Sequence, residues 1–222
     1  MKNFQTNSDV IKRRFERDAV SFDAIYDSQK SEFSGWFNKS FRKPIFERFD
    51  ITFEKMGELK NKTVLDVGCG SGVYSAKCAM KGAEKVKGID FSAPMLELAQ
   101  KRAATQGVQQ ACDFELIDFL KMDVKEKYNY SIAMGVFDYL SDPLTFLHKL
   151  KAATKERIII SFPGHSWIRE PLRKLRYFFT SKGRVFFYSL KDIERLVSNM
   201  QFRQVEIRPL KTGSGYILIA DV

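Results

Sequence analysis

The stretch VLDVGCGSG, Val64–Gly72, decides the fold of this chain. A short apolar run typical of a buried strand leads into a turn with glycine at every second position, and a segment with helical spacing follows. Because glycine lets a backbone approach a ligand closely, we expect a side chain at Gly68, Gly70 or Gly72 to fill space that a ligand would occupy. The N–H groups of the following helix would point at that ligand.

The spacing of these glycines also limits the identity of the ligand. A dinucleotide-binding turn would need glycine where the chain has Val73. The turn therefore indicates a nucleoside-type ligand of another kind.

Strand-like and helix-like segments alternate after this turn. The predicted strands are 64–67, 86–89, 114–117, 130–134, 157–162, 202–208 and 215–220. The predicted helices between them are 73–81, 93–106, 143–153 and 190–200. Alternation predicts right-handed crossovers and a parallel sheet, and the short turn at 211–214 suits an antiparallel hairpin. We therefore predict an α/β fold with a Rossmann-like, doubly wound, seven-stranded sheet, mostly parallel with an antiparallel C-terminal hairpin.

Helical spacing also marks the chain before the first strand. Residues 9–30 and 44–56 predict two helices. We expect residues 1–60 to form an N-terminal helical cap, and residues 61–222 to form the ligand-binding domain.

Two carboxylates follow successive predicted strands. Asp90 ends the second strand, where its oxygens can accept both hydroxyls of a ribose. Asp118 follows the third strand and can accept from the exocyclic amine of a purine, while Phe119 or Met95 packs on the ring face. Ser92 is placed to cap the helix that begins beside it. The alternative for Asp118 is a solvated cap, and the alternative for the glycines is a simple turn.

These motifs, in this order, resemble the class I S-adenosylmethionine-dependent methyltransferases over roughly residues 60–165. Val64–Gly72 resembles the family's glycine-rich first motif, Asp90 its ribose-binding acid and Ile117–Phe119 its adenine-contacting turn. Residues 134–143 are similar to the segment that faces both cofactor and acceptor. The resemblance implies S-adenosylmethionine as cofactor and S-adenosylhomocysteine as product, with Asp66 assisting the backbone around Gly68 and Gly70 at the methionine part. The cofactor-binding residues that it implies are Tyr26, Asp66, Gly68, Cys69, Gly70, Asp90, Phe91, Met95, Asp118, Phe119 and Met134.

Methyl transfer from a sulfonium needs the two partners aligned more than it needs a nucleophile on the enzyme. A general base is needed only when the acceptor is a hydroxyl or a protonated amine. The candidate catalytic residues are His165, just past the fifth strand, and Asp138 and Tyr139, after the fourth. Tyr139 either lines the pocket or packs beneath the cap. Residues 134–137 lack the Asn/Asp-Pro-Pro-aromatic pattern of relatives that methylate adenine or glutamine amides, which disfavours that chemistry.

The net charge of +10 comes from one part of the chain: residues 148–211 carry 15 basic and 5 acidic side chains. This asymmetry points to a local basic surface facing a phosphate-bearing substrate, an anionic membrane or nucleic acid. Residues 165–187 form an insertion with aromatics on one helical face and basic residues on the other. That insertion is interpreted as a lid over the acceptor, with a peripheral membrane contact as the alternative. A lipid-like or phosphate-bearing acceptor would suit both.

Composition narrows the classes of function. No apolar run approaches the length of a membrane-spanning helix, and the N-terminus has no secretion signal. The three cysteines show no C-x-x-C pattern, so we expect no metal site and a reducing cytoplasm. We predict methyl transfer to a small molecule, at oxygen. The alternatives are an RNA or protein methyltransferase, disfavoured because no RNA-binding module is appended, and a non-catalytic S-adenosylmethionine-binding protein.

Overall fold

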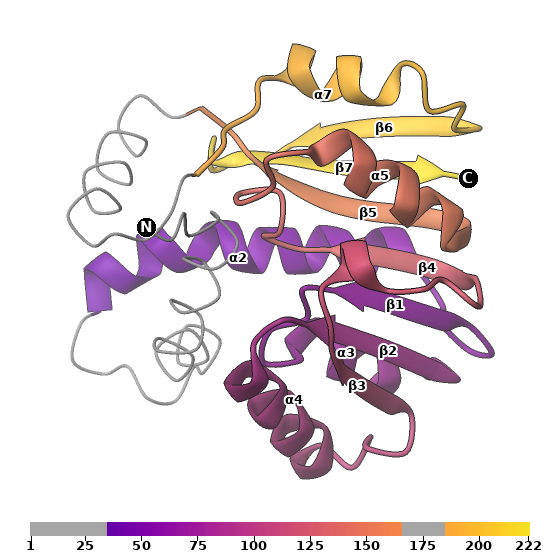
Figure 1. The fold of residues 1–222 in the computed structure, drawn as a ribbon. Helices are drawn as coiled ribbons and strands as arrows, with labels where there is room; N and C mark the ends of the chain where they lie inside the picture. The colour runs from indigo at the N-terminus through magenta and orange to yellow at the C-terminus, as the bar shows by residue number, and fades with distance from the viewer. Residues whose placement is uncertain (1–34, 166–184) are drawn as a thin grey trace, which may run out of the picture.

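The computed structural model describes residues 35–165 and 185–222, which form one seven-stranded sheet in the order β3-β2-β1-β4-β5-β7-β6 (Figure 1). The strands are β1 Thr63–Val67, β2 Lys85–Asp90, β3 Cys112–Leu116, β4 Tyr128–Ala133, β5 Thr154–Pro163, β6 Gln204–Pro209 and β7 Gly215–Asp221. Strands β1 to β5 run parallel, and β7 is antiparallel to both β5 and β6. The predicted fold class is confirmed.

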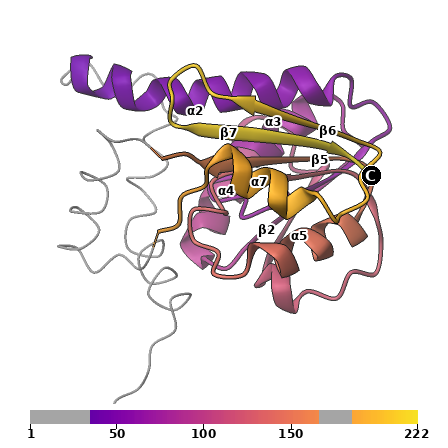
Figure 2. The same cartoon turned by 90° about the horizontal axis from the view of Figure 1, so that it is seen from above.

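Helices cover both faces of the sheet (Figure 2). They are α2 Gly35–Met56, α3 Val73–Met80, α4 Ala93–Thr105, α5 Pro143–Ala152 and α7 Leu190–Val197, with a 3₁₀ turn, η1, at Phe119–Lys121. Side chains of α2 and α3 share one hydrophobic cluster, and side chains of α5 and α7 share the other. Helix α4 packs beside α3.

The centre of the sheet explains why its sequence is apolar without interruption. Ile158, Ile159 and Ile160 of β5 are fully buried. Ile158 and Ile160 lie in the cluster on one face, and Ile159 lies in the cluster on the other. Because successive side chains of a strand point to opposite faces, a strand covered on both sides must be apolar at every position.

Helix α2 departs from its prediction, because it begins at Gly35 and contains Pro44 instead of starting there. An internal proline removes one helical hydrogen bond and costs about 3 kcal/mol. The second half of the helix offsets this cost by burying Ile51, Phe53 and Met56 against the sheet, at about 1.5–3 kcal/mol for each side chain. The second half of α2 therefore belongs to the hydrophobic core.

Smaller differences concern the ends of elements, which shift by one to three residues. Helix α7, for example, ends at Val197 instead of Met200, because the backbone closes there into a turn in which the Met200 N–H donates to the Val197 carbonyl. The predicted helix 9–30, with Tyr26, and all of the predicted lid except its ends lie outside the described residues. Within residues 35–165 and 185–222, no helix is both long and apolar enough to cross a bilayer.

Candidate functional site

The carboxyl ends of the parallel strands bring the predicted cofactor residues to one edge of the sheet. The glycine turn follows β1, Asp90 ends β2, Asp118 follows β3 and Met134 follows β4. The register pairs Val67 at the end of β1 with Ile89, one residue before Asp90. Ligands of open α/β sheets bind at such an edge.

The three glycines of the turn have different roles, which corrects the expectation that each opens space for a ligand. All three adopt a left-handed backbone, with φ of 69°, 52° and 72° for Gly68, Gly70 and Gly72. A Cβ on Gly72 would come within 2.8 Å of the Ala99 Cβ, and one on Gly68 within 2.5 Å of the Val136 Cγ2. A Cβ on Gly70 would meet nothing within 4 Å. Gly68 and Gly72 are therefore required because Val136 and Ala99, from other segments of the same chain, pack closely against them. Of the three glycines, only Gly70 faces open space.

Asp90 links the glycine turn to the start of α4. Its Oδ2 accepts from the Gly70 N–H at 2.9 Å, and its Oδ1 accepts from the Ser92 N–H at 2.9 Å. Burial raises the pKa of this carboxyl, and the backbone hydrogen bonds partly offset the effect. Each oxygen keeps a further lone pair for a ligand donor. Asp90 is thus held in position beside the open side of Gly70.

Asp66 lies beneath the turn and is 1% exposed. The Ser75 hydroxyl, on α3, donates to its Oδ2 at 2.6 Å. Burial raises the pKa of Asp66 to about 7, an effect that the hydrogen bond from Ser75 reduces and the charge of Asp90 increases. A carboxyl with this pKa changes charge near neutral pH.

The start of α4 corrects one local prediction. Ser92 occupies the N-cap position, but its side chain makes no capping hydrogen bond. Its hydroxyl is buried with no hydrogen-bond partner among the described residues. Met95, in the first turn of α4, is buried, while Phe91 is partly exposed. Cys69, inside the glycine turn, is buried with a free thiol.

The segment after β3 has a mixed outcome. Asp118 caps η1 by accepting from the Leu120 N–H through Oδ1 at 3.0 Å, as the capping alternative anticipates. The Phe119 ring points into the core, where it packs edge-on against Phe146 with ring centroids 4.9 Å apart. This placement does not favour Phe119 as the side chain that stacks on a purine.

Arg48, a residue of α2 that the sequence analysis does not single out, reaches the same edge. Its Nη1 lies 3.5 Å from the Ser161 Oγ, which accepts from the Gly135 N–H at 2.8 Å. A Cβ on Gly135 would lie 4.0 Å from the same Nη1. The Arg48 Nε is buried and has no hydrogen-bond partner among the described residues. A guanidinium held with an unused buried donor is suited to an anionic group.

The candidate catalytic residues lie at the ends of β4 and β5. The exposed His165 lies beside Phe187, with ring centroids 5.8 Å apart and the ring planes tilted by 37°. Asp138 accepts from the Phe186 N–H at 2.9 Å through its backbone carbonyl, and the Tyr139 N–H donates to the Val136 carbonyl. Tyr188, nearby, is buried against Phe137 and Phe162, and burial raises its pKa to about 12. Tyr188 is therefore a core residue and a poor base.

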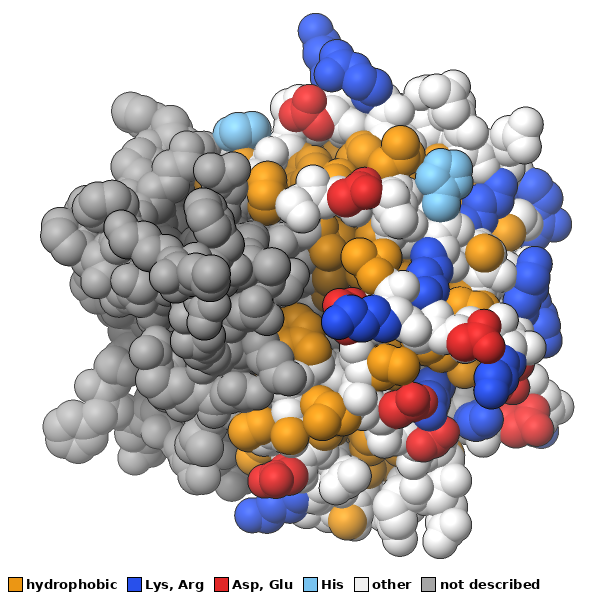
Figure 3. All heavy atoms as spheres, viewed as in Figure 1, with side chains coloured by type: hydrophobic (Ala, Val, Ile, Leu, Met, Phe, Trp, Pro, Cys, Tyr) orange, Lys and Arg blue, Asp and Glu red, His pale blue; other side chains and the backbone are white. Residues whose placement is uncertain are grey.

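The basic surface is only partly described. Six of the fifteen basic residues between 148 and 211 lie within 166–184. On the described part of the face in Figure 3, acidic and basic side chains are mixed.

With this geometry established, comparison with known proteins decides the family. The family described as methyltransferase domain matches residues 58–181. The chain belongs to this methyltransferase family. Together with the sheet order, the match confirms the predicted class I S-adenosylmethionine-dependent methyltransferase and its cofactor.

Curated relatives of this methyltransferase include ubiquinone biosynthesis O-methyltransferases. That of Actinobacillus pleuropneumoniae is 33% identical over 121 residues, covering 52% of this chain and 50% of the relative. That of Histophilus somni is 31% identical over 144 residues, covering 60% and 59%. The chain thus spans about half the length of the curated relatives that it matches.

Solved structures share the fold over nearly the whole chain. Magnesium protoporphyrin IX methyltransferase from Synechocystis, with bound S-adenosylhomocysteine, has a TM-score of 0.76 at 21% identity and covers 97% of this chain and 99% of its own. Phosphoethanolamine N-methyltransferase 2 from Haemonchus contortus has a TM-score of 0.75 at 14% identity and covers 99% and 60%. At these identities the likeness establishes the fold.

Proposed function

We propose that this methyltransferase transfers the methyl group of S-adenosylmethionine to an oxygen of a small-molecule acceptor. The observation that carries the proposal is the cradle at Gly70, where open space, a left-handed backbone and the Asp90 carboxylate meet. The cofactor, when bound, supplies an electrophilic methyl group. The chain has to bind it, orient it and bring an acceptor oxygen into line.

Five residues of the described chain suit the parts of this cofactor. The carboxylate oxygens of Asp90 accept hydrogen bonds from the ribose hydroxyls. Gly70 leaves room for the methionine part of the cofactor to lie close to the backbone. Asp118 accepts from the adenine amine through the oxygen that does not cap η1. Arg48, which is half-buried, binds the carboxylate of the methionine part with its guanidinium. Met95, in the first turn of α4, packs against the adenine ring.

The choice of oxygen and of a small molecule has separate support. Oxygen is the atom named in the matching ubiquinone-pathway enzymes, and residues 134–137 lack the pattern of adenine and amide methylation. His165, exposed at the end of β5, is the proposed general base for a hydroxyl acceptor, with Asp138 and Tyr139 beside the acceptor. The insertion 165–187 is proposed as the lid over a lipid-like or phosphate-bearing acceptor, with contact to a membrane surface as the alternative.

Labelled-methyl transfer tests the function. The purified chain is incubated with S-adenosylmethionine labelled in its methyl group and with separate polar, lipid, RNA and protein fractions of a cell extract. We expect label in a polar or lipid small molecule, with fragmentation that assigns the methyl group to oxygen. Label confined to RNA or protein, or S-adenosylhomocysteine binding with no transfer into any fraction, would contradict the proposal.

Replacing Arg48 with methionine tests the carboxylate site. Because hydrogen bonds to charged groups are worth about 1.5–3 kcal/mol, we expect calorimetry to detect S-adenosylhomocysteine affinity lower by about tenfold or more. Affinity for 5′-methylthioadenosine, which lacks the amino-acid part, should change by less than about twofold because this ligand has no carboxylate for Arg48 to bind. Lys43→Met, at an exposed position of α2, is the matched control. Equal losses for both ligands would show that Arg48 only supports the fold.

A further inference from the structure

Helix α5 carries two lysines that make the same kind of contact with different parts of the chain. The Lys149 ammonium donates to the Leu120 carbonyl at 2.9 Å and to the Met122 carbonyl at 2.5 Å, and it lies 5.5 Å from the centre of the Phe119 ring. Lys149 therefore ties the segment after β3 to α5 by charge-assisted hydrogen bonds and a cation–π contact.

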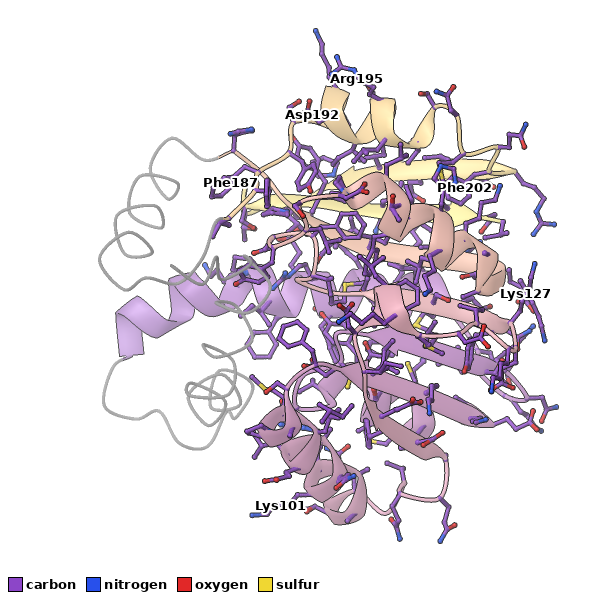
Figure 4. All side chains as sticks on the ribbon, viewed as in Figure 1. Lys101, Lys127, Phe187, Asp192, Arg195 and Phe202 are labelled. Atoms are coloured by element: carbon purple, nitrogen blue, oxygen red, sulfur yellow. The ribbon has the colours of Figure 1, made fainter. Side chains whose placement is uncertain are left out.

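Lys151 makes the corresponding contacts with the connection between α7 and β6. Its ammonium donates to the Met200 and Gln201 carbonyls and lies 5.1 Å from the centre of the Phe202 ring. This loop precedes β6, whose first residue pairs with Asp221 opposite the start of β5. It thus lies at the amino edge of the sheet, and Figure 4 shows Phe202 at the opposite end of the molecule from Phe187.

The loop that Lys149 holds is the one that begins at Asp118. The Asp118 carbonyl accepts from the N–H groups of Lys121 at 2.8 Å and Met122 at 3.1 Å, and its side chain accepts from Leu120. The orientation of the Asp118 carboxylate therefore depends on the geometry of residues 120–122. Lys149 fixes that geometry from outside by binding two of the three carbonyls.

This turn needs an external support because it is short. Element η1 has only three residues, and 3₁₀ turns have poorer hydrogen-bond geometry than α-helices. Its anchors are the Phe119 ring against Phe146 and the ammonium of Lys149, which lies one turn further along α5. The ring anchors the start of the turn, and the ammonium anchors its end.

We propose that Lys149 is a positioning residue that orients the Asp118 carboxylate for recognition of the adenine amine. The proposal rests on the proposed function, since it requires Asp118 to be the acceptor of that amine. It predicts a role in choosing the base of the ligand, beyond any role in stability. Lys151, with the same bonds at the other edge, should have no such role.

The experiment measures the preference for S-adenosylhomocysteine over S-inosylhomocysteine, which has a carbonyl oxygen in place of the amine. Calorimetry gives both affinities for the wild type and for Lys149→Met, Lys149→Arg, Lys151→Met and Asp118→Ala. A site built to accept from an amine should prefer the adenosyl ligand by about thirtyfold or more. We expect Lys149→Met to reduce this preference by about fivefold or more because it frees the carboxylate to reorient. Lys149→Arg, which keeps the donors, should stay within about twofold of the wild type, as should Lys151→Met.

Each outcome decides between distinct failures. If Asp118→Ala keeps the preference, Asp118 does not accept the amine, and both that assignment and the role of Lys149 are overturned. If Asp118→Ala loses the preference and Lys149→Met retains it, only the role of Lys149 is overturned. Equal losses in Lys149→Met and Lys151→Met would reduce both lysines to structural supports. Because the readout is a ratio of affinities on folded protein, a lower melting temperature alone does not imitate the expected result.

Discussion

The variant Asp90→Ala is expected to bind S-adenosylhomocysteine at least about 100-fold more weakly than the wild type, because two hydrogen bonds from ribose hydroxyls to a carboxylate are lost at about 1.5–3 kcal/mol each. Two further donors lose their acceptor, since the N–H groups of Gly70 and Ser92 both bond to this carboxylate. The loop that faces the ligand is then released at its open position. This loss of order adds to the loss of the direct contacts.

Calorimetry against two ligands separates direct binding from loop ordering. The 2′,3′-dideoxy analogue of S-adenosylhomocysteine lacks the ribose hydroxyls, so Asp90→Ala should weaken its binding much less than that of the parent ligand. Asp113→Ala, at an exposed carboxylate of β3 that pairs with Lys87, is the control and should bind as the wild type does. Thermal unfolding of each variant checks that the fold is retained. Similar losses for both ligands in Asp90→Ala would remove Asp90 from the ribose site.

The second large effect concerns the stability of the fold as pH changes. Burial raises the pKa of Asp66 from 3.8 to about 7. The folded state then binds a proton more tightly than the unfolded state between about pH 4 and pH 7, so this carboxyl makes the free energy of unfolding fall as pH rises through that range. The full penalty, about 4 kcal/mol as an order of magnitude, is reached above pH 7.

Replacing Asp66 with asparagine should remove this dependence. The asparagine carbonyl can still accept from the Ser75 hydroxyl, and it carries no charge to bury. We expect Asp66→Asn to unfold at a higher denaturant concentration than the wild type at pH 8, and the difference to shrink toward pH 5. Asp113→Asn, at an exposed position, should differ from the wild type by less than about 0.5 kcal/mol at either pH. Parallel stability curves for wild type and Asp66→Asn would contradict a raised pKa of the buried Asp66 carboxyl.

The order of the elements was predictable because each of them follows a local pattern. The apolar run Ile158–Ile160 predicts a central strand. The alternation of strands with helices predicts a parallel sheet, in which the carboxyl ends of the strands lie at one edge. Asp90 and Asp118 could be assigned to that edge because each lies at the carboxyl end of a predicted strand. Pro44 was misread as a helix start because the burial that tolerates it comes from side chains further along α2.

The glycine turn shows which features a local sequence pattern predicts and which depend on tertiary contacts. The stretch Val64–Gly72 by itself determined a strand, a turn and a nucleoside-type ligand, because backbone freedom and hydrophobic period are properties of adjacent residues. Tertiary structure alone decided that Gly70 faces open space while Gly68 and Gly72 pack against Val136 and Ala99. Those contacts join residues far apart in the chain, and no spacing within the turn encodes them.

The same reason explains Arg48 and Lys149. Arg48 meets Ser161 across 113 positions of the chain, and Lys149 meets Leu120 across 29. In the sequence, both are charged residues on helices, where a solvated side chain is the ordinary expectation. The sequence by itself therefore determined the fold and the edge of the sheet at which the predicted cofactor residues meet. The packing of α2 and α5 onto the sheet decided which charged groups reach that edge, because only the folded chain brings such distant donors and acceptors within hydrogen-bond range.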